Sequence, residues 1–410
     1  MAKRARLLSA AAGPVLPDEL VWEILARLPA RGLLRCHAVC RDWRRLATSA
    51  DFLLAHHRHQ PPRPLVFGCA RWRSGAAADA DAAVDSVDLI RHPAERRRVL
   101  GFSDYRQHQS FKIHSSCDGL LLFVSGRAFY ICNPATRQVT PVPALTGGGS
   151  QVTLYPHPSS GDGEYRVLKW KYPDAVCILA VGSSEKPRRI GLPEAFLPPV
   201  FWIDEIGFLP PVLLHGCLHW HLRKPEDAIL VFDTVAESFR WMVSPNVDGY
   251  GAHLVEIDGG MLGIGIVTQG MAKLWVLQDY ETEVWSLRYH VKLPVARMRS
   301  IAREGFFSWK IVCHRGEILV YIQSSVFLFL CDTKGNLREK IHLDNMLPCA
   351  MRHCLKESLV NHAFFGRHGG AHVGQPQFFL WSVAYAGAAP SLFCLPLQVC
   401  RLFKPIPICK

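Results

Sequence analysis

No run of apolar residues in this 410-residue sequence approaches the ~18 residues that a membrane-spanning helix requires. Its 14 cysteines form no CxxC…CxxC pattern and are too sparse for a disulfide scaffold. The N-terminus, "MAKRARLLSAAAGPVL", begins like a signal peptide, but Gly13 and Pro14 interrupt its short apolar run. We therefore expect a soluble protein with reduced thiols in the cytoplasm, the nucleus or both.

The common signatures of catalysis and cofactor binding are also missing. We find no GxSxG nucleophile motif, no P-loop and no dinucleotide-binding fingerprint, since the glycines of "GGMLGIG" precede no helix pattern. A catalytic Cys–His pair remains an open alternative, because the two residues of such a pair come together only in the folded chain. We expect no enzymatic activity of the chain's own and no bound cofactor.

Basic residues are in excess, with 47 Lys and Arg against 35 Asp and Glu and a net charge of +12. Much of the excess is local, near Lys3, between Arg27 and Arg45, and between Arg91 and Arg98. No recognition-helix motif and no basic strand interleaved with aromatic residues accompanies these charges. Solvated basic faces are therefore the favoured interpretation, and nucleic acid is an unlikely partner.

Residues 16–47, "LPDELVWEILARLPARGLLRCHAVCRDWRRLA", predict three short helices. The first begins near Pro17, with Asp18 and Glu19 where the positive helix end favours acids, and Pro29 ends it. Apolar residues recur at helical spacing on several faces. A segment of this length, below the ~40 residues that usually fold alone, cannot bury them all, so another chain must cover part of this surface.

At these residues the sequence resembles the F-box, through "LPDELVWEILARLP", then "LL", then "VCRDW" and "L". The resemblance implies docking onto the Skp adaptor of a Skp-cullin-F-box ubiquitin ligase, and through the adaptor onto a cullin. For Ile24, Leu34 and Val39, packing within the module is as good an interpretation as adaptor contact. The adaptor-binding residues implied are Leu16, Pro17, Leu20, Ile24, Leu25, Leu28, Pro29, Leu33, Leu34, Val39, Cys40, Trp43 and Leu46.

Beyond the Pro-rich segment "HRHQPPRP", the sequence changes to short β-like runs punctuated by Gly and Pro. Four segments share a plan of a Gly, two strands and an Asx residue that opens a turn into a third strand, and a fifth has the strands alone. The Asx side chain can bond the backbone two residues on and so fix the turn. Such units suit propeller blades. The Asx residues are Asn133, Asp233, Asp279 and Asp332, and apolar Val139, Phe239 and Trp285 follow the first three by six residues.

This part resembles the F-box-associated domain of plant F-box proteins, through "HSSCDGLLLF", "YICNPATRQ", "GCLHWHL" and "HCLKESLVNHAFF". The resemblance implies a β-propeller-like domain that binds a protein client, whose identity and binding face the sequence does not give. The predicted fold is a small three-helix F-box followed by a mainly-β, propeller-like domain. The predicted ranges are a basic tail (1–13), the F-box (14–56), a linker (57–64), the β domain (65–365) and a divergent tail (366–410).

Two histidine-rich segments are candidate metal sites. Cys217, His219 and His221 would share one face of a strand, and His368 and His372 lie in "GRHGGAHVG". Zinc usually needs four ligands, and no second pair is visible, so we expect no metal. We expect a non-catalytic substrate receptor of a ubiquitin ligase; the alternatives are a binding module outside the ubiquitin system and a lectin-like or oxidase-like propeller that binds sugar or metal.

Overall fold

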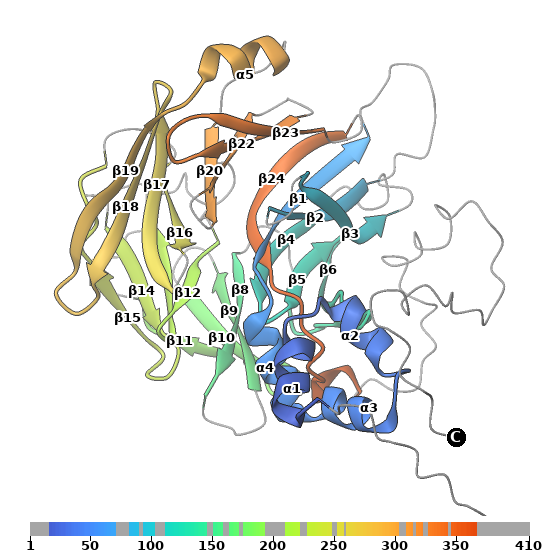
Figure 1. Ribbon diagram of the computed structural model, residues 1–410. Coiled ribbons are helices and arrows are strands. Elements are labelled where there is room, and N and C mark those ends of the chain that lie inside the picture. The colour runs from blue at the N-terminus through green and yellow to red at the C-terminus, as the bar shows by residue number, and fades with distance from the viewer. Residues whose placement is uncertain are drawn as a thin grey trace, which may run out of the picture.

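The computed structural model of the chain describes residues 16–70, 82–89, 93–102, 111–145, 151–158, 164–171, 175–192, 210–221, 228–247, 252–257, 260–302, 309–314, 317–322, 327–342 and 346–366. A helical module at the N-terminus packs beside a ring of β-sheets (Figure 1). This confirms the predicted fold, an α-helical module followed by a mainly-β propeller. The predicted tail over 366–410 lies, after Gly366, outside the described residues. None of the described helices is long and apolar enough to cross a membrane.

The helical module contains one helix more than the sequence predicts. Its helices are α1 (Asp18–Ala26), α2 (Ala30–Cys36), α3 (Arg41–Thr48) and α4 (Ala50–His59). Ser49 is the N-cap of the unpredicted α4, and its hydroxyl accepts from the Phe52 N–H. The helix contributes buried Phe52 and Leu53 to the module's core. Buried His56 and Gln60 both bond the carbonyl of Leu28, at 2.8 and 2.9 Å, which ties the end of α4 to the α1–α2 turn.

The connection to the β domain is shorter than the predicted linker over 57–64. Residues 57–59 complete α4, and Arg63 and Pro64 already begin β1 (Arg63–Ala70). Only Gln60, Pro61 and Pro62 lie between the two elements, and the side chain of Gln60 is buried. The prolines stop the helix and start the strand instead of forming a spacer.

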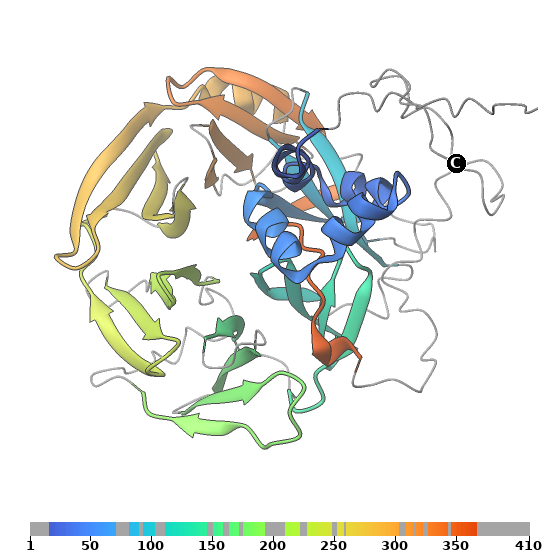
Figure 2. The ribbon, with the colours of Figure 1, turned by 60° about the horizontal axis from the view of Figure 1, so that its bottom comes forward.

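The described strands form six four-stranded sheets, which we number as blades 1 to 6 around the ring (Figure 2). Blade 1 contains β1, β2 (Ala82–Asp88), β3 (Glu95–Phe102) and β24 (Met346–Leu355). Blade 2 contains β4 (Lys112–Cys117), β5 (Leu120–Ser125), β6 (Ala128–Asn133) and β7 (Gln138–Pro141). Blade 3 contains β8 (Val152–His157), β9 (Glu164–Lys171), β10 (Ala175–Ala180) and β11 (Arg188–Ile190).

The other three blades follow in chain order. Blade 4 contains β12 (Val212–Leu214), β13 (Cys217–His221), β14 (Ile229–Asp233) and β15 (Ser238–Met242). Blade 5 contains β16 (His253–Ile257), β17 (Met261–Thr268), β18 (Met271–Asp279) and β19 (Val284–Lys292). Helix α5 (Val295–Ala302) leads to blade 6, with β20 (Trp309–His314), β21 (Glu317–Ile322), β22 (Phe327–Asp332) and β23 (Leu337–His342).

Blade 1 closes the ring by joining the two ends of the domain. Its strand order is β24-β1-β2-β3, so the last strand of the chain pairs with the first, in antiparallel register from Arg63↔Leu355 to Ala70↔Met346. The sequence repeats do not reveal this blade, because its strands are not consecutive. Ring closure therefore gives β1, the first strand of the domain, a hydrogen-bonded neighbour on each side.

The repeated Asx turns form as the sequence predicts. The side-chain Oδ1 of Asn133 accepts from the Ala135 N–H at 3.0 Å, and Asp233, Asp279 and Asp332 accept from the residue two positions on at 2.8, 2.9 and 3.0 Å. Each turn connects the third strand of its blade to the outermost strand. The apolar residues six positions after the first three turns, Val139, Phe239 and Trp285, all pack against buried clusters.

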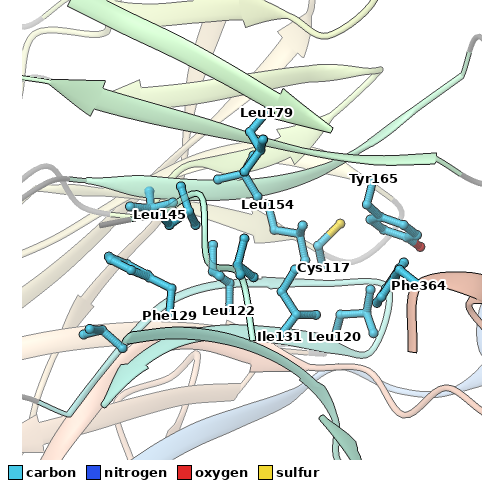
Figure 3. Packing of buried hydrophobic residues seen from close by; sticks show 14 residues of the cluster. Cys117, Leu120, Leu122, Phe129, Ile131, Leu145, Leu154, Tyr165, Leu179 and Phe364 are labelled. Atoms are coloured by element: carbon cyan, nitrogen blue, oxygen red, sulfur yellow. The ribbon is translucent and has the colours of Figure 1, made fainter. Parts of the chain in front are cut away.

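The core of the propeller consists of apolar clusters between neighbouring blades. Figure 3 shows one of them, in which Leu120, Leu122 and Ile131 of blade 2 face Leu154 and Leu179 of blade 3. The same cluster includes Phe364, from the short 3-10 helix η1 (Ala363–Phe365) after the last strand. The described residues after β24 therefore contribute to the core of the domain.

Candidate functional site

The helical module has large apolar side chains that are exposed and that no other described residue covers. Leu16, Leu20 and Ile24 are 47, 50 and 45% exposed and recur every four residues, so they share one face of α1 and the residues that lead into it. Leu34 of α2 and Val39 before α3 are 46 and 60% exposed. We call these five residues the module's apolar face. Of the two interpretations open for Ile24, Leu34 and Val39, their exposure favours contact with a partner.

The remaining predicted adaptor-binding residues divide by burial. Pro17 and Cys40 are exposed, and Leu28, Pro29, Trp43 and Leu46 are half-buried. Leu25 and Leu33 are fully buried in the module's own core, which corrects their predicted place at the surface. Helix α4 packs against α1, and both leucines lie in the same buried cluster as Phe52 and Leu53 of α4. The unpredicted α4 also presents Leu54, which is 44% exposed and which the sequence pattern did not single out.

One carboxylate joins the module to the propeller. Glu357, just after β24, accepts a hydrogen bond from the Ala30 N–H at 3.1 Å, at the start of α2. Its other oxygen lies 3.0 Å from an amino group of Arg63, the first residue of β1. Arg63 is 5% exposed, and its Nε also donates to Asp88 in β2 at 3.3 Å. The buried guanidinium is thus paired with carboxylates from both ends of the domain.

A second set of polar contacts holds α4. The Nδ1 of His57 lies 2.9 Å from the carbonyl oxygen of Glu357, which can only accept, so Nδ1 carries the hydrogen. Its Nε2 lies 3.6 Å from Asp118 in the β4–β5 turn, and the hydroxyl of Tyr165 donates to the other oxygen of Asp118 at 3.0 Å. Burial works to raise the pKa of Asp118. The hydrogen bond and charge of His57, together with the hydrogen bonds of Tyr165 and Cys117, outweigh burial and keep that pKa below its usual value.

Residues 356–366, which we call the C-terminal segment, contact both parts of the protein. Leu359 packs in the core of the helical module, and Phe364 packs in the core between blades 2 and 3. Between them, the carbonyl of Ser358 accepts from the buried amide of Asn133 at 3.0 Å. Gly119 lies so close that a Cβ there would come within 2.4 Å of the Ser358 Cβ. These contacts fix the orientation of the module on the ring (Figure 2).

His219, one of the candidate metal ligands, has other partners in the structure. His219 is fully buried, with Nδ1 3.1 Å from the carbonyl of Val212 and Nε2 2.8 Å from the hydroxyl of Tyr280. Burial lowers the pKa of His219 to about 4, which keeps the ring neutral, and burial raises the pKa of the Cys217 thiol. Over the described ranges, no group of three or more His, Cys, Asp or Glu side chains is placed to hold a metal ion. His368 and His372 lie outside those ranges.

Comparison with known proteins identifies both parts. Residues 93–365 match the model of the F-box associated beta propeller domain, and residues 14–59 match the F-box-like model. Among curated Arabidopsis thaliana proteins, F-box protein At5g49610 is 26% identical over 67% of this chain and 78% of its own length. F-box protein At5g65850 is 25% identical over 67% and 71%, and putative F-box protein At3g10240 is 22% identical over 80% and 85%.

Proposed function

This chain belongs to the family of F-box proteins that carry an F-box associated β-propeller domain, and we propose that it is the substrate-recognition subunit of a Skp-cullin-F-box ubiquitin ligase. That combination of domains implies such a receptor in general. In the proposed assembly, the helical module binds a Skp adaptor, which links it to a cullin, and the propeller binds a protein client. The assembly would work in the cytoplasm, the nucleus or both.

The observation that carries the adaptor half of the proposal is the module's apolar face. Leu16, Leu20, Ile24, Leu34 and Val39 are each about half exposed or more in the chain alone. Burying the exposed part of one such side chain contributes on the order of 1 kcal/mol. A partner that covers all five gains several kcal/mol, which is a substantial part of a specific affinity.

In the part of the proposal that concerns the client, this chain has to bind the client and does not have to catalyse a reaction. F-box proteins are typically non-catalytic adaptors, and the raised thiol pKa of Cys217 gives no activated nucleophile. The conjugating enzyme would bring activated ubiquitin, and the receptor would hold a client lysine near it. Holding two reactants in one assembly raises their effective concentration, which is how a binding protein accelerates transfer.

The rigid junction supports this role. Because Glu357, His57 and the C-terminal segment fix the module on the ring, a client bound to the propeller stays at a set position relative to the adaptor. A flexible tether would spread the client over many positions and lower its effective concentration. The three connecting residues, Gln60 to Pro62, leave no room for such a tether.

The test compares ubiquitination of bound clients in plant cells. Wild type and a Leu20→Asp/Ile24→Asp variant are expressed, and proteins captured on each are examined for ubiquitin-modified lysines. We expect the same clients on both, with modified lysines depleted on the variant because it cannot recruit the adaptor. Equal modification on both would contradict the proposal and favour a binding module that works outside the ubiquitin system.

A further inference from the structure

Helices α1 and α2 are too short to hold their positions alone. They have nine and seven residues, and isolated helices shorter than about 12 to 15 residues are marginal in water. Each follows a proline that makes no side-chain cap, whereas Cys40 caps α3 and Ser49 caps α4. The positions of α1 and α2 therefore depend on contacts with other parts of the chain.

Glu357 supplies the missing cap of α2. Its carboxylate accepts from the Ala30 N–H at 3.1 Å, which satisfies one of the donors at the start of that helix. The carboxylate is held in turn by Arg63, 3.0 Å away, and the backbone carbonyl of Glu357 bonds the side chain of His57 at 2.9 Å. A residue from beyond the last propeller strand thus completes a helix of the module.

Leu359 fills the core beneath the module's apolar face. It is 6% exposed, and every other buried member of its cluster lies within residues 21–53. These members come from both helices and include Val21 and Leu25 of α1, and Ala30 and Leu33 of α2. The C-terminal segment therefore contributes to the packing that sets α1 against α2.

The core and the apolar face are linked through neighbours in the sequence. Leu20, Ile24 and Leu34, which we propose to contact the adaptor, each adjoin one of those buried residues in the chain. Because protein interiors are close-packed, removing bulk from this core shifts the elements around it. A change at Leu359 should therefore alter the spacing between the α1 and α2 parts of the apolar face, although it alters no exposed side chain there.

Ring closure places both residues. Strand β24 pairs with β1 as far as Arg63↔Leu355, so Glu357 follows the last pair by two residues. Beyond it, the carbonyl of Ser358 accepts from Asn133 of blade 2 at 3.0 Å. The segment, orange-red in Figure 2, then runs beside the blue helices. The positions of Glu357 and Leu359 therefore depend on the joined ends of the ring.

We propose that Glu357 and Leu359 are positioning residues for adaptor binding, so that the chain binds the adaptor at full affinity only when its ring is closed. This rests on the proposed function, because it requires that the apolar face binds a Skp adaptor. Neither residue belongs to that face, and each acts by fixing the helices that carry it. Such coupling is reciprocal, so adaptor binding must strengthen the contacts of the C-terminal segment by the same factor.

The test measures adaptor affinity of the full chain by titration calorimetry, under conditions in which circular dichroism shows each variant to be folded. Leu359→Ala and Glu357→Ala should each weaken adaptor binding by about tenfold. Leu359→Met, which nearly keeps the volume, should bind within about twofold of wild type. If Leu359→Ala does not fold, the milder Leu359→Val replaces it, with an expected loss of about threefold.

The matched control is Phe364→Ala, in the same segment. Phe364 is equally buried, at 7% exposed, but packs between blades 2 and 3. This variant should lose at least as much stability as Leu359→Ala and yet bind the adaptor as wild type does. Equal loss of binding in the control would overturn the proposal, because adaptor affinity would then follow overall stability.

Hydrogen exchange gives a readout that a merely structural role would not move. In wild type, the adaptor should slow exchange of the backbone amides of residues 357–360, which are not part of the apolar face. That slowing should be smaller in Leu359→Ala and in Glu357→Ala. Unchanged exchange at these amides when wild type binds the adaptor would overturn the proposal, as would wild-type affinity in both variants.

The Leu20→Asp/Ile24→Asp variant separates this proposal from the proposed function. If wild type does not bind the adaptor, both fail. If wild type binds, the double variant does not, and Leu359→Ala and Glu357→Ala bind as wild type does, the adaptor-binding role stands and the positioning role fails.

Discussion

The side chain of Glu357 accepts a 3.1 Å hydrogen bond from the backbone N–H of Ala30, a residue from the opposite end of the described chain. The acceptor follows the last strand of the propeller, and the donor is the first residue of α2. Four N–H groups at the start of any helix lack partners within it, and here the propeller supplies one. The helical module thus depends on the completed ring for part of its own hydrogen bonding.

Glu357→Ala should lower the free energy of unfolding by about 2 to 3 kcal/mol. The substitution leaves the Ala30 N–H unpaired and removes one of two carboxylates from the buried Arg63 guanidinium. Urea denaturation of the purified chain measures the change. The control is Glu19→Ala, which removes an exposed acid on α1 and should cost less than about 0.5 kcal/mol. An equally small effect of Glu357→Ala would show that its contacts with Ala30 and Arg63 do not stabilise the fold.

Two residues at equivalent turn positions should differ in their effect on stability. Asn133 and Asp233 each accept from the N–H two residues on, but the Asn133 amide is buried and also donates to the carbonyl of Ser358. We expect Asn133→Ala to cost about 2 to 3 kcal/mol and Asp233→Ala about 1 kcal/mol. Equal losses in urea denaturation would mean that the Ser358 contact adds nothing.

Neighbouring residues of α1 should show opposite effects on folding and on binding. Leu25 is fully buried, whereas Ile24 is 45% exposed. Leu25→Ala should destabilise the chain by about 2 to 5 kcal/mol. Ile24→Ala should change stability by less than about 0.5 kcal/mol yet weaken adaptor binding. Thermal unfolding and adaptor titration of both variants check that Leu25 belongs to the core and Ile24 to the adaptor-binding surface. A large loss of stability in Ile24→Ala would contradict this assignment.

Stability should fall as the pH is lowered from about 7 to 5. Burial, with the charges of Lys112 and His353, lowers the pKa of His114 to about 3, while burial lowers the pKa of His219 to about 4. Histidine in an unfolded chain titrates near 6.5. Between these values the unfolded chain binds protons that the folded chain does not, so lower pH favours unfolding.

Urea denaturation at pH 7, 6 and 5 measures that decline, and in His114→Leu it should be shallower. The same decline in both proteins would show that His114 titrates normally in the folded chain.

Local features of the fold could be predicted from the sequence. The Asx turns are an example, because Asn133, Asp233 and Asp279 determine the turn through bonds to residues two positions away. The apolar excess of residues 16–47 likewise predicted an exposed apolar surface, which Leu16, Leu20 and Ile24 provide.

Features that depend on distant residues could not be predicted. The pairing of β1 with β24 and the contacts of Glu357 join opposite ends of the chain, and no local pattern encodes them. The distinction between Leu25 and Ile24 was hidden for the same reason. Both lie at helical spacing, and only the position of α4, itself missed, decides which one faces inward.

The central claim, that the module's apolar face binds a Skp adaptor, is tested most directly by titrating the purified chain with a purified adaptor in a calorimeter. We predict one-to-one binding by wild type, and loss of binding in Leu20→Asp/Ile24→Asp while the variant stays folded. Val235→Asp, at an equally exposed valine on blade 4, should bind as wild type does. Absence of binding by folded wild type, or unchanged binding by the double variant, would contradict the account.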